Sequence, residues 1–319
     1  MTILVYLCGT DLESRSKMAT SDLQEMLNAD LSDKVNLIVY TGGCKQWQNN
    51  VISSRNNQIW QVKDEGLVCL DEDAGSVSMV KPDTLADFIR YGAKKFPANR
   101  MALIFWDHGG GSVSGFGYDE KFASSGSMDL AEIDEALTDG GVKFDFVGFD
   151  ACLMATTETA LMLAKHADYL IASEETEPGI GWYYTDWLTA LGENTSMSTV
   201  EIGKKIVDDF VDTCASKCRG QKTTLSVVDL AELEATELQM LSKLASDEYT
   251  IDERMMLDVT VHRDRDIIFH DICLNDAAIT KGAVARIVHL KVECDGVQAL
   301  ECGGDQHRGK CPPYHDGAA

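Results

Sequence analysis

The chain has 319 residues, of which 45% are hydrophobic and 25% charged, enough for one large core with or without a small appendage. Its 28 basic and 52 acidic residues give a net charge of -24, which argues against nucleic acid as a partner and favours basic substrates. The sequence predicts no membrane span, because no apolar run approaches ~18–20 residues, and the start MTILVYLCG lacks the basic region of a signal peptide.

Short apolar runs and amphipathic stretches alternate along the first 246 residues. The expected strands are 3–8, 35–43, 58–63, 66–70, 102–106, 144–149, 168–175 and 223–230. The expected helices begin at a capping box formed by Thr10 and Glu13 and continue with 83–96, 129–138, 153–164, 199–218 and 231–246. This alternation predicts an α/β fold of three layers around a mostly parallel sheet.

Two stretches differ from this pattern. Residues 109–128 are rich in glycine and serine and predict a long exposed loop. Residues 247–319 hold five of the seven histidines and have weak helical periodicity, and a foreign origin is one interpretation of them. We therefore expect a domain at 1–246 and a C-terminal tail of uncertain structure at 247–319. The ten cysteines lie largely within apolar or helical patterns, which favours free thiols over a disulfide framework.

Two expected strands end in chemically reactive residues. ALIFW is followed by Asp107, His108 and three glycines, and FDFVGF is followed by Asp150, Ala151 and Cys152. Substrates of parallel α/β sheets bind beyond the carboxyl ends of the strands. A thiol and an imidazole at that edge indicate nucleophilic catalysis, with His108 as the acid or base. Either residue alone is more typical of a buried or hydrogen-bonded structural role.

The surroundings of Cys152 have opposing effects on a thiolate. A helix starting directly after Cys152 would favour it, and the N–H groups of Cys152 and Gly109 could bind an oxyanion. Asp150 would raise the pKa of a neighbouring thiol, so its presence suggests another role, such as holding a cationic substrate. A cap or turn residue is the structural alternative for Asp150.

The segments YLCGTDLES (6–14), DHGGG (107–111), DACLM (150–154) and ASEETEPGIGW (172–182) resemble clostripain-type cysteine peptidases, over residues 3 to about 246. That resemblance implies the caspase-like fold and a hydrolase: a thiol protease with a Cys152/His108 dyad that cleaves polypeptides after Arg or Lys. It also implies that Asp150 lies in the S1 pocket, and it favours a secreted or cell-surface location.

The sequence does not identify a second acidic residue for the S1 pocket. Family members often have an acid directly after the tryptophan of this motif, where this chain has Tyr183. Glu174 and Asp186 are candidates, with a solvated turn as the alternative for Glu174. Asp11 is a further candidate, although N-capping of a helix also explains it.

The resemblance further implies autoproteolysis of a zymogen in the 109–128 loop, after which the two chains stay associated. Lys121 lies in this loop, so the expected cut is Lys121–Phe122, and until then the loop or Lys121 would occlude the acidic pocket. A solvated lysine is the alternative.

No cofactor is required by this chemistry, and the sequence assigns no metal ligand to the site. Calcium is possible, because clostripain depends on it and the acids at 71–73 and 119–120 offer oxygen ligands. A zinc-dependent regulatory tail is one rival hypothesis, carried by Cys294, Cys302, His307, Cys311 and His315. Another rival is a catalytically silent caspase-like scaffold for binding or adhesion.

Overall fold

The computed structural model describes residues 1–233 and the backbone of four strands between residues 256 and 303. The chain divides into two compact units, Met1–Asp247 and Glu248–Ala319, a division next to the expected boundary at residue 246. The residues 234–255, 264–265, 275–288, 295–296 and 304–319 lie outside the description.

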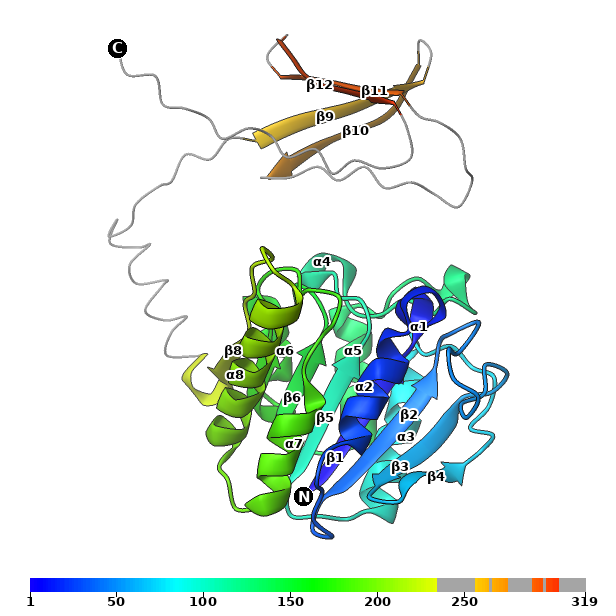
Figure 1. Cartoon of the computed structure of the whole chain (residues 1–319), viewed down its shortest axis with the longest axis vertical. Coiled ribbons are helices and arrows are strands. Elements are labelled where there is room, and N and C mark those ends of the chain that lie inside the picture. Colours follow the sequence, from blue (N-terminus) through cyan, green and yellow to red (C-terminus); the bar gives the residue numbers. More distant parts are fainter. Residues whose placement is uncertain (234–255, 264–265, 275–288, 295–296, 304–319) are drawn as a thin grey trace. The chain divides into compact units, whose positions relative to one another are not determined.

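The first unit is built on an eight-stranded sheet in the order β4-β3-β2-β1-β5-β6-β7-β8 (Figure 1). The five strands β2, β1, β5, β6 and β7 are parallel, while β3 pairs antiparallel with β2, β4 with β3 and β8 with β7. The expected mostly parallel sheet is therefore confirmed. The strands are β1 (Thr2–Cys8), β2 (Asn36–Gly42), β3 (Gln58–Lys63), β4 (Gly66–Asp71), β5 (Met101–Trp106), β6 (Phe144–Asp150), β7 (Ala167–Ala172) and β8 (Ser226–Asp229).

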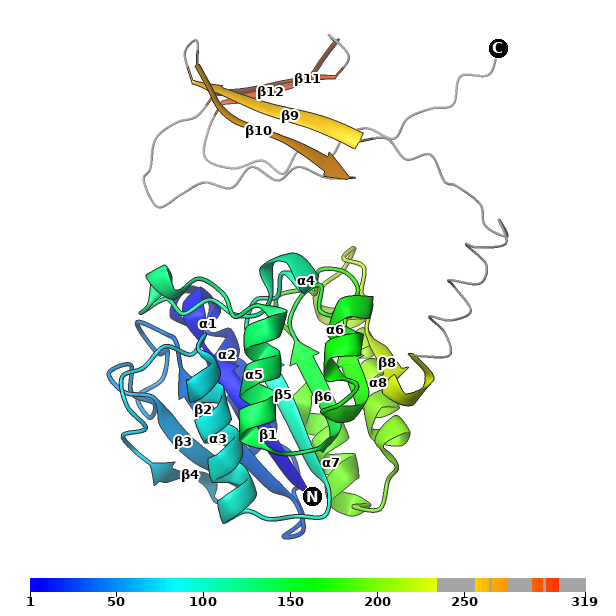
Figure 2. The same ribbon diagram turned by 180° about the vertical axis from the view of Figure 1, so that it is seen from behind.

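Helices cover both faces of this sheet, which gives the three layers. Figure 1 shows α2, α7 and α8 on one face, and Figure 2 shows α3, α5 and α6 on the other. The described helices are α1 (Thr10–Ser16), α2 (Met18–Leu27), α3 (Pro82–Lys95), α4 (Gly111–Ser114), α5 (Leu130–Gly140), α6 (Thr157–Leu163), α7 (Tyr184–Glu193) and α8 (Thr199–Lys217), with 3-10 turns at Ala123–Ser125 and Leu230–Glu232.

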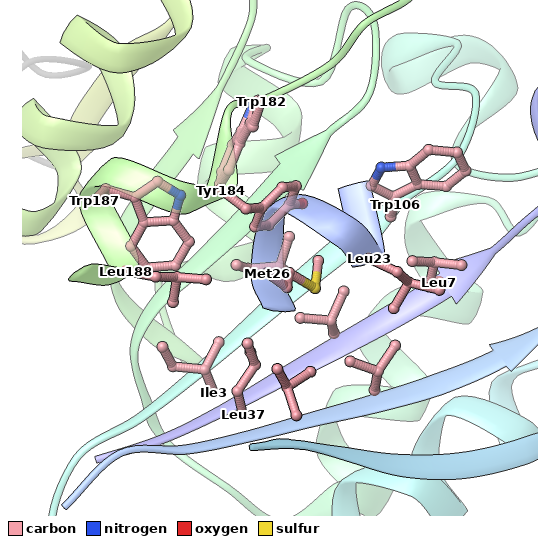
Figure 3. Close-up of a cluster of buried hydrophobic side chains, with 14 of the residues drawn as sticks. Ile3, Leu7, Leu23, Met26, Leu37, Trp106, Trp182, Tyr184, Trp187 and Leu188 are labelled. Atoms are coloured by element: carbon pink, nitrogen blue, oxygen red, sulfur yellow. The ribbon is translucent and has the colours of Figure 1, made fainter. Parts of the chain in front are cut away.

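The central strands have buried side chains on both faces, as expected for a parallel sheet between two helical layers. Ile3, Val5 and Leu7 of β1 pack into one core, and Leu4, Tyr6 and Cys8 into the other. Figure 3 shows part of the first core, where side chains from β1, α2 and β5 gather with Trp182, Tyr184 and Trp187.

The order of the strands brings three strand ends together. From β1 the chain moves outward through β2, β3 and β4, then returns to form β5 on the other side of β1. Such a switch point is where open α/β sheets bind ligands. In the register, Leu7, Trp106 and Asp150 form one row across β1, β5 and β6. His108 and Cys152 each follow this row by two residues, so both reach the same edge of the sheet.

The helix expected directly after Cys152 begins only at Thr157, with Thr156 as its N-cap, so the prediction of a helix dipole acting on Cys152 is wrong. The reason lies in the backbone. Leu153 adopts a left-handed φ of 66°, and the N–H groups of Leu153 and Ala155 donate to the carbonyls of Glu175 and Ser173. Residues 152–155 therefore pair with another segment of the chain instead of starting a helix.

Three further expectations differ from the structure. The predicted capping box at Thr10 is absent, because Gly9 precedes α1 and Glu13 is buried, accepting hydrogen bonds from Thr20 and Gln48. The 109–128 segment is only partly exposed, since Phe116, Asp119 and Met128 are buried. The helix α7 has no counterpart among the predicted elements. Of the helix expected at 231–246, most lies outside the described residues.

The described part of the second unit consists of two antiparallel hairpins. β9 (Met256–Arg263) pairs with β10 (Asp266–Leu274), and β11 (His289–Cys294) pairs with β12 (Val297–Gly303). Across the described parts of both units, every helix is too short or too polar to cross a bilayer.

Candidate active site

The imidazole of His108 contacts a carboxylate from a neighbouring strand end. Its Nε2 lies 2.8 Å from Oδ1 of Asp11, in the first turn of α1. Both side chains are partly exposed, with relative accessibilities of 47% and 30%. Asp11 also lies 3.4 Å from the guanidinium of Arg15, one turn along α1. Asp11 therefore does not cap a helix, and it holds Nε2 of His108 so that Nδ1 is the nitrogen left for other contacts.

Asp107, next to His108, has a structural role. Its buried carboxylate accepts hydrogen bonds from the backbone N–H of His108 at 2.6 Å and of Tyr118 at 2.6 Å. Burial raises the pKa of Asp107 to about 7, although the charge of His108 and these hydrogen bonds lower it. Asp107 thus ties the start of the 109–128 segment to its middle.

Gly109 brings the two reactive motifs into direct contact. A Cβ atom on Gly109 would lie 2.0 Å from the carbonyl oxygen of Cys152, so no other residue fits. Glycine is needed here because the backbone of Cys152 approaches closely. In the described part of the chain, no acceptor takes the backbone N–H of Gly109 or of Cys152. Both donors are therefore available at this edge.

A segment formed by residues 173–182 runs alongside residues 150–155. Ala155 and Leu153 donate to the carbonyls of Ser173 and Glu175 at 2.9 and 3.0 Å. Farther along, the N–H of Glu177 donates to Sγ of Cys152 at 3.2 Å, and that of Trp182 donates to Asp150 at 3.1 Å. The 173–182 segment thus passes directly over the thiol and over Asp150.

Asp150 ends β6 and is 5% exposed. Its two oxygens accept from the N–H of Trp182 and, at 2.8 Å, from the hydroxyl of Tyr184. Gly181 has a φ of 62°, and a Cβ there would lie 2.7 Å from Oδ1 of Asp150. Burial raises the pKa of Asp150 to about 7, although the hydrogen bonds from Tyr184 and Trp182 oppose the rise.

Further carboxyl groups lie close to Asp150. Asp22 of α2 is buried, accepts a hydrogen bond from the indole of Trp106 at 2.7 Å, and has its pKa raised by burial and then by Asp150. Glu25 of the same helix accepts from the N–H of Tyr184 and has its pKa raised by burial. The ammonium of Lys217 lies 3.8 Å from Glu25. This region therefore carries an excess of acid.

Glu177 is the acid that the sequence prediction missed. Both of its carboxyl oxygens are buried, and no hydrogen bond of normal geometry reaches either of them. Burial, and then the charges of Asp150 and Cys152, raise the pKa of Glu177 well above its usual value, while the nearby indole of Trp182 lowers it. The sequence offered a sign of this residue. Glu177 lies in ASEETEPGIGW, one of the segments that resemble clostripain-type peptidases, directly before Pro178 and Gly179.

The structure does not bring Glu174 or Asp186 to Asp150. Glu174 is exposed and accepts a hydrogen bond from the hydroxyl of Ser226. Asp186 is exposed in the first turn of α7. Tyr183 is partly buried, and the ammonium of Lys217 lies 5.2 Å from the centre of its ring.

Lys121 lies in a turn held by a buried carboxylate. Oδ1 of Asp119 accepts from the N–H groups of Lys121 and Phe122, and Oδ2 accepts from the N–H of Met79. The ammonium of Lys121 donates to the carbonyl of Arg55 at 3.0 Å. In this conformation Lys121 therefore contacts Arg55, and its side chain does not occupy the acidic region around Asp150.

Three of the acids suggested for calcium accept backbone hydrogen bonds. Asp71 and Asp73 accept from N–H groups two residues ahead, and Asp119 accepts three times. Among the residues whose placement is described, no three His, Cys, Asp or Glu side chains converge as metal ligands. Of the zinc candidates in the tail, Cys294 and Cys302 lie on β11 and β12, and the others lie outside the described residues.

The sequence model of the Clostripain family, Peptidase C11, matches residues 5–277. The chain belongs to this family of cysteine peptidases. It is similar to a secreted C11 cysteine protease from Bacteroides thetaiotaomicron in complex with an irreversible peptide inhibitor, with a TM-score of 0.61 and 24% identity over 76% of this chain and 70% of that one. An inactive zymogen C11 protease from Parabacteroides distasonis gives a TM-score of 0.58 and 22% identity, over 76% and 65% of the two chains. These structures confirm the caspase-like fold.

A short stretch of the peptidase is also similar to curated proteins of another kind. An NAD kinase from Acetivibrio thermocellus is 46% identical over 63 residues, which are 19% of this chain and 22% of the kinase. An NAD kinase from Natranaerobius thermophilus is 47% identical over 68 residues, 21% and 24% of the two chains. The matched stretch thus spans less than a quarter of these relatives.

Proposed function

We propose that this C11 peptidase is an endopeptidase that cleaves polypeptides after Arg or Lys through Cys152 and His108. The observation that supports this most is the convergence of both residues on one sheet edge beside a buried acidic group centred on Asp150. An acidic pocket attracts a basic side chain and repels an acidic one. Membership of the family supports the peptidase chemistry, and the acidic charge around Asp150 supports the preference for Arg or Lys.

In the proposed reaction the thiolate of Cys152 attacks the carbonyl carbon of the scissile bond. The N–H groups of Gly109 and Cys152 stabilise the oxyanion, and their lack of other acceptors supports this role. His108 gives a proton to the leaving amine, the C–N bond breaks and a thioester forms. Water then attacks the thioester while His108 takes one of its protons, which releases the acid product and restores the Cys152 thiolate.

Asp11 acts on this reaction as a positioning residue. Its contact with Nε2 fixes the orientation of the imidazole, so Nδ1 is the nitrogen that exchanges protons with the substrate. Because Cys152 is partly covered by the backbone of Glu177, the 173–182 segment shifts when substrate binds.

Self-processing at Lys121–Phe122 remains part of the proposal, but without occlusion of the acidic pocket by Lys121, which contacts Arg55 instead. A peptidase binds its substrate in an extended form, whereas Lys121 and Phe122 lie in a turn held by Asp119. The turn therefore opens locally before it is cut. After the cut, β5 and β6 lie on different fragments but stay paired, which supports continued association of the two chains.

The test is hydrolysis of peptides with Arg, Lys, Asp or Asn before the scissile bond, by wild type and by Cys152→Ala. Cleavage of Arg and Lys peptides by wild type alone is the expected result. Equal hydrolysis by both proteins would overturn the assignment of Cys152, and binding without turnover would favour the scaffold hypothesis. No kinase activity is proposed, because less than a quarter of a kinase is matched.

A further inference from the structure

Glu177 is a buried acid without a counter-charge. Its carboxyl oxygens are shielded from solvent and receive no hydrogen bond of normal geometry from the described residues. Burying a carboxylate without a partner is strongly unfavourable, so such a group is neutral or awaits a cation. The neighbouring Asp150 differs, because Tyr184 and Trp182 satisfy its oxygens.

The position of Glu177 is set by the hydrogen bonds of the 173–182 segment. Its N–H is 3.2 Å from the Cys152 sulfur, and Trp182, five residues later, is bonded to Asp150. The charges of Asp150 and Cys152 both raise the pKa of Glu177, so its carboxyl group lies near both of them. A basic side chain that reaches Asp150 from a peptide bond near Cys152 would therefore come close to Glu177.

We propose that Glu177 is the second carboxylate of the S1 pocket and binds the cationic side chain of the substrate together with Asp150. This inference rests on the proposed function and assigns the second acid to a position that none of the sequence candidates occupied. Guanidinium groups bind two carboxylates well because they offer five donors in a planar fork. With Glu177 in this role, the pocket has two carboxylates even though Tyr183 stands where family members often have an acid.

The groups around Glu177 explain why the site suits a ligand cation. The titratable side chains that face it are Asp150 from β6, Cys152, Tyr184 at the start of α7 and Cys214 of α8. None of these four is a base. Burial of two neighbouring acids favours their neutral forms until a cation enters, when a proton leaves to solvent.

The test uses agmatine, a guanidinium without a peptide bond, and Cys152→Ala protein, which cannot turn over substrate. Calorimetry is expected to show agmatine binding to Cys152→Ala, weakened about 30-fold or more by adding Glu177→Gln. Glu175→Gln is the matched control, because Glu175 is an exposed acid two residues earlier in the same segment. That variant should bind as the parent does.

A second readout compares Arg with its neutral isostere citrulline before the scissile bond. Glu177→Gln should lower the Arg-to-citrulline ratio of kcat/KM, mainly through KM. If wild type prefers Arg and Glu177→Gln keeps both that ratio and agmatine affinity, the inference fails and the proposed function stands. If wild type cleaves neither Arg nor Lys peptides, the proposed function fails. A melting midpoint of Glu177→Gln well below wild type would assign Glu177 to the fold and overturn the inference.

Discussion

Nε2 of His108 lies 2.8 Å from Oδ1 of Asp11, across the ends of two adjacent strands, β5 and β1. We expect Asp11→Ala to lower kcat about 100-fold with little change in KM, because a misoriented imidazole transfers protons poorly but does not bind substrate. Asp11→Asn should retain part of the activity, since its amide oxygen can still accept a hydrogen bond. Steady-state kinetics on an Arg peptide measure both.

Arg15→Gln is the control for this prediction, because it removes the other partner of Asp11 and leaves His108 untouched. It should behave like wild type. A rise in KM with unchanged kcat in Asp11→Ala would instead place Asp11 in substrate binding.

Gly109→Ala should inactivate the enzyme. The added Cβ would lie 2.0 Å from the Cys152 carbonyl oxygen, so the two motifs must move apart. We expect a loss of about 1–3 kcal/mol in stability and of about 100-fold or more in kcat, because an oxyanion donor moves with the backbone. Gly179→Ala is the matched control, as a Cβ there meets nothing within 4 Å. Near-normal activity of Gly109→Ala would rule out close packing of the motifs.

The architecture was predictable because it depends on local patterns: apolar runs that alternate with amphipathic stretches, and glycines after the strand ends. The placement of His108 and Cys152 followed from the same patterns. Contacts between distant segments were not predictable, since they depend on tertiary packing. The pairing of Leu153 with Glu175 removed an expected helix turn, and burial of Glu177 beside Asp150 turned an ordinary loop acid into a candidate binding group.

Asp119→Asn should speed self-cleavage at Lys121–Phe122. The carboxylate accepts from three backbone N–H groups, and an amide in its place presents donors to some of them. The turn would then open more often. Mass spectrometry over time should show the new fragments earlier in Asp119→Asn than in wild type. Asp119→Asn combined with Cys152→Ala should stay intact, and a cut there would point to a contaminating protease.

The raised pKa values of Asp107 and Asp150 predict how the free energy of unfolding depends on pH in the absence of substrate. Burial raises the pKa of each to about 7, above the value of an Asp in an unfolded chain. The folded state therefore binds more protons between about pH 4 and 7, so the free energy of unfolding should fall as pH rises through that window. Denaturant unfolding at pH 5, 6, 7 and 8 measures this. A stability that increased steadily from pH 5 to 8 would contradict it.

Activity should change in the opposite direction over the same range. A basic side chain binds a charged Asp150 more tightly than a neutral one, so kcat/KM for Arg peptides should rise as pH passes through about 7. The same peptide with citrulline is the control, because its neutral side chain gains little from ionisation of Asp150. The ratio of the two kcat/KM values removes any effect of pH that both substrates share. That ratio should increase from pH 6 to 8 in wild type and stay flat in Asp150→Asn. A flat ratio in wild type would mean that Asp150 does not meet the substrate's charge.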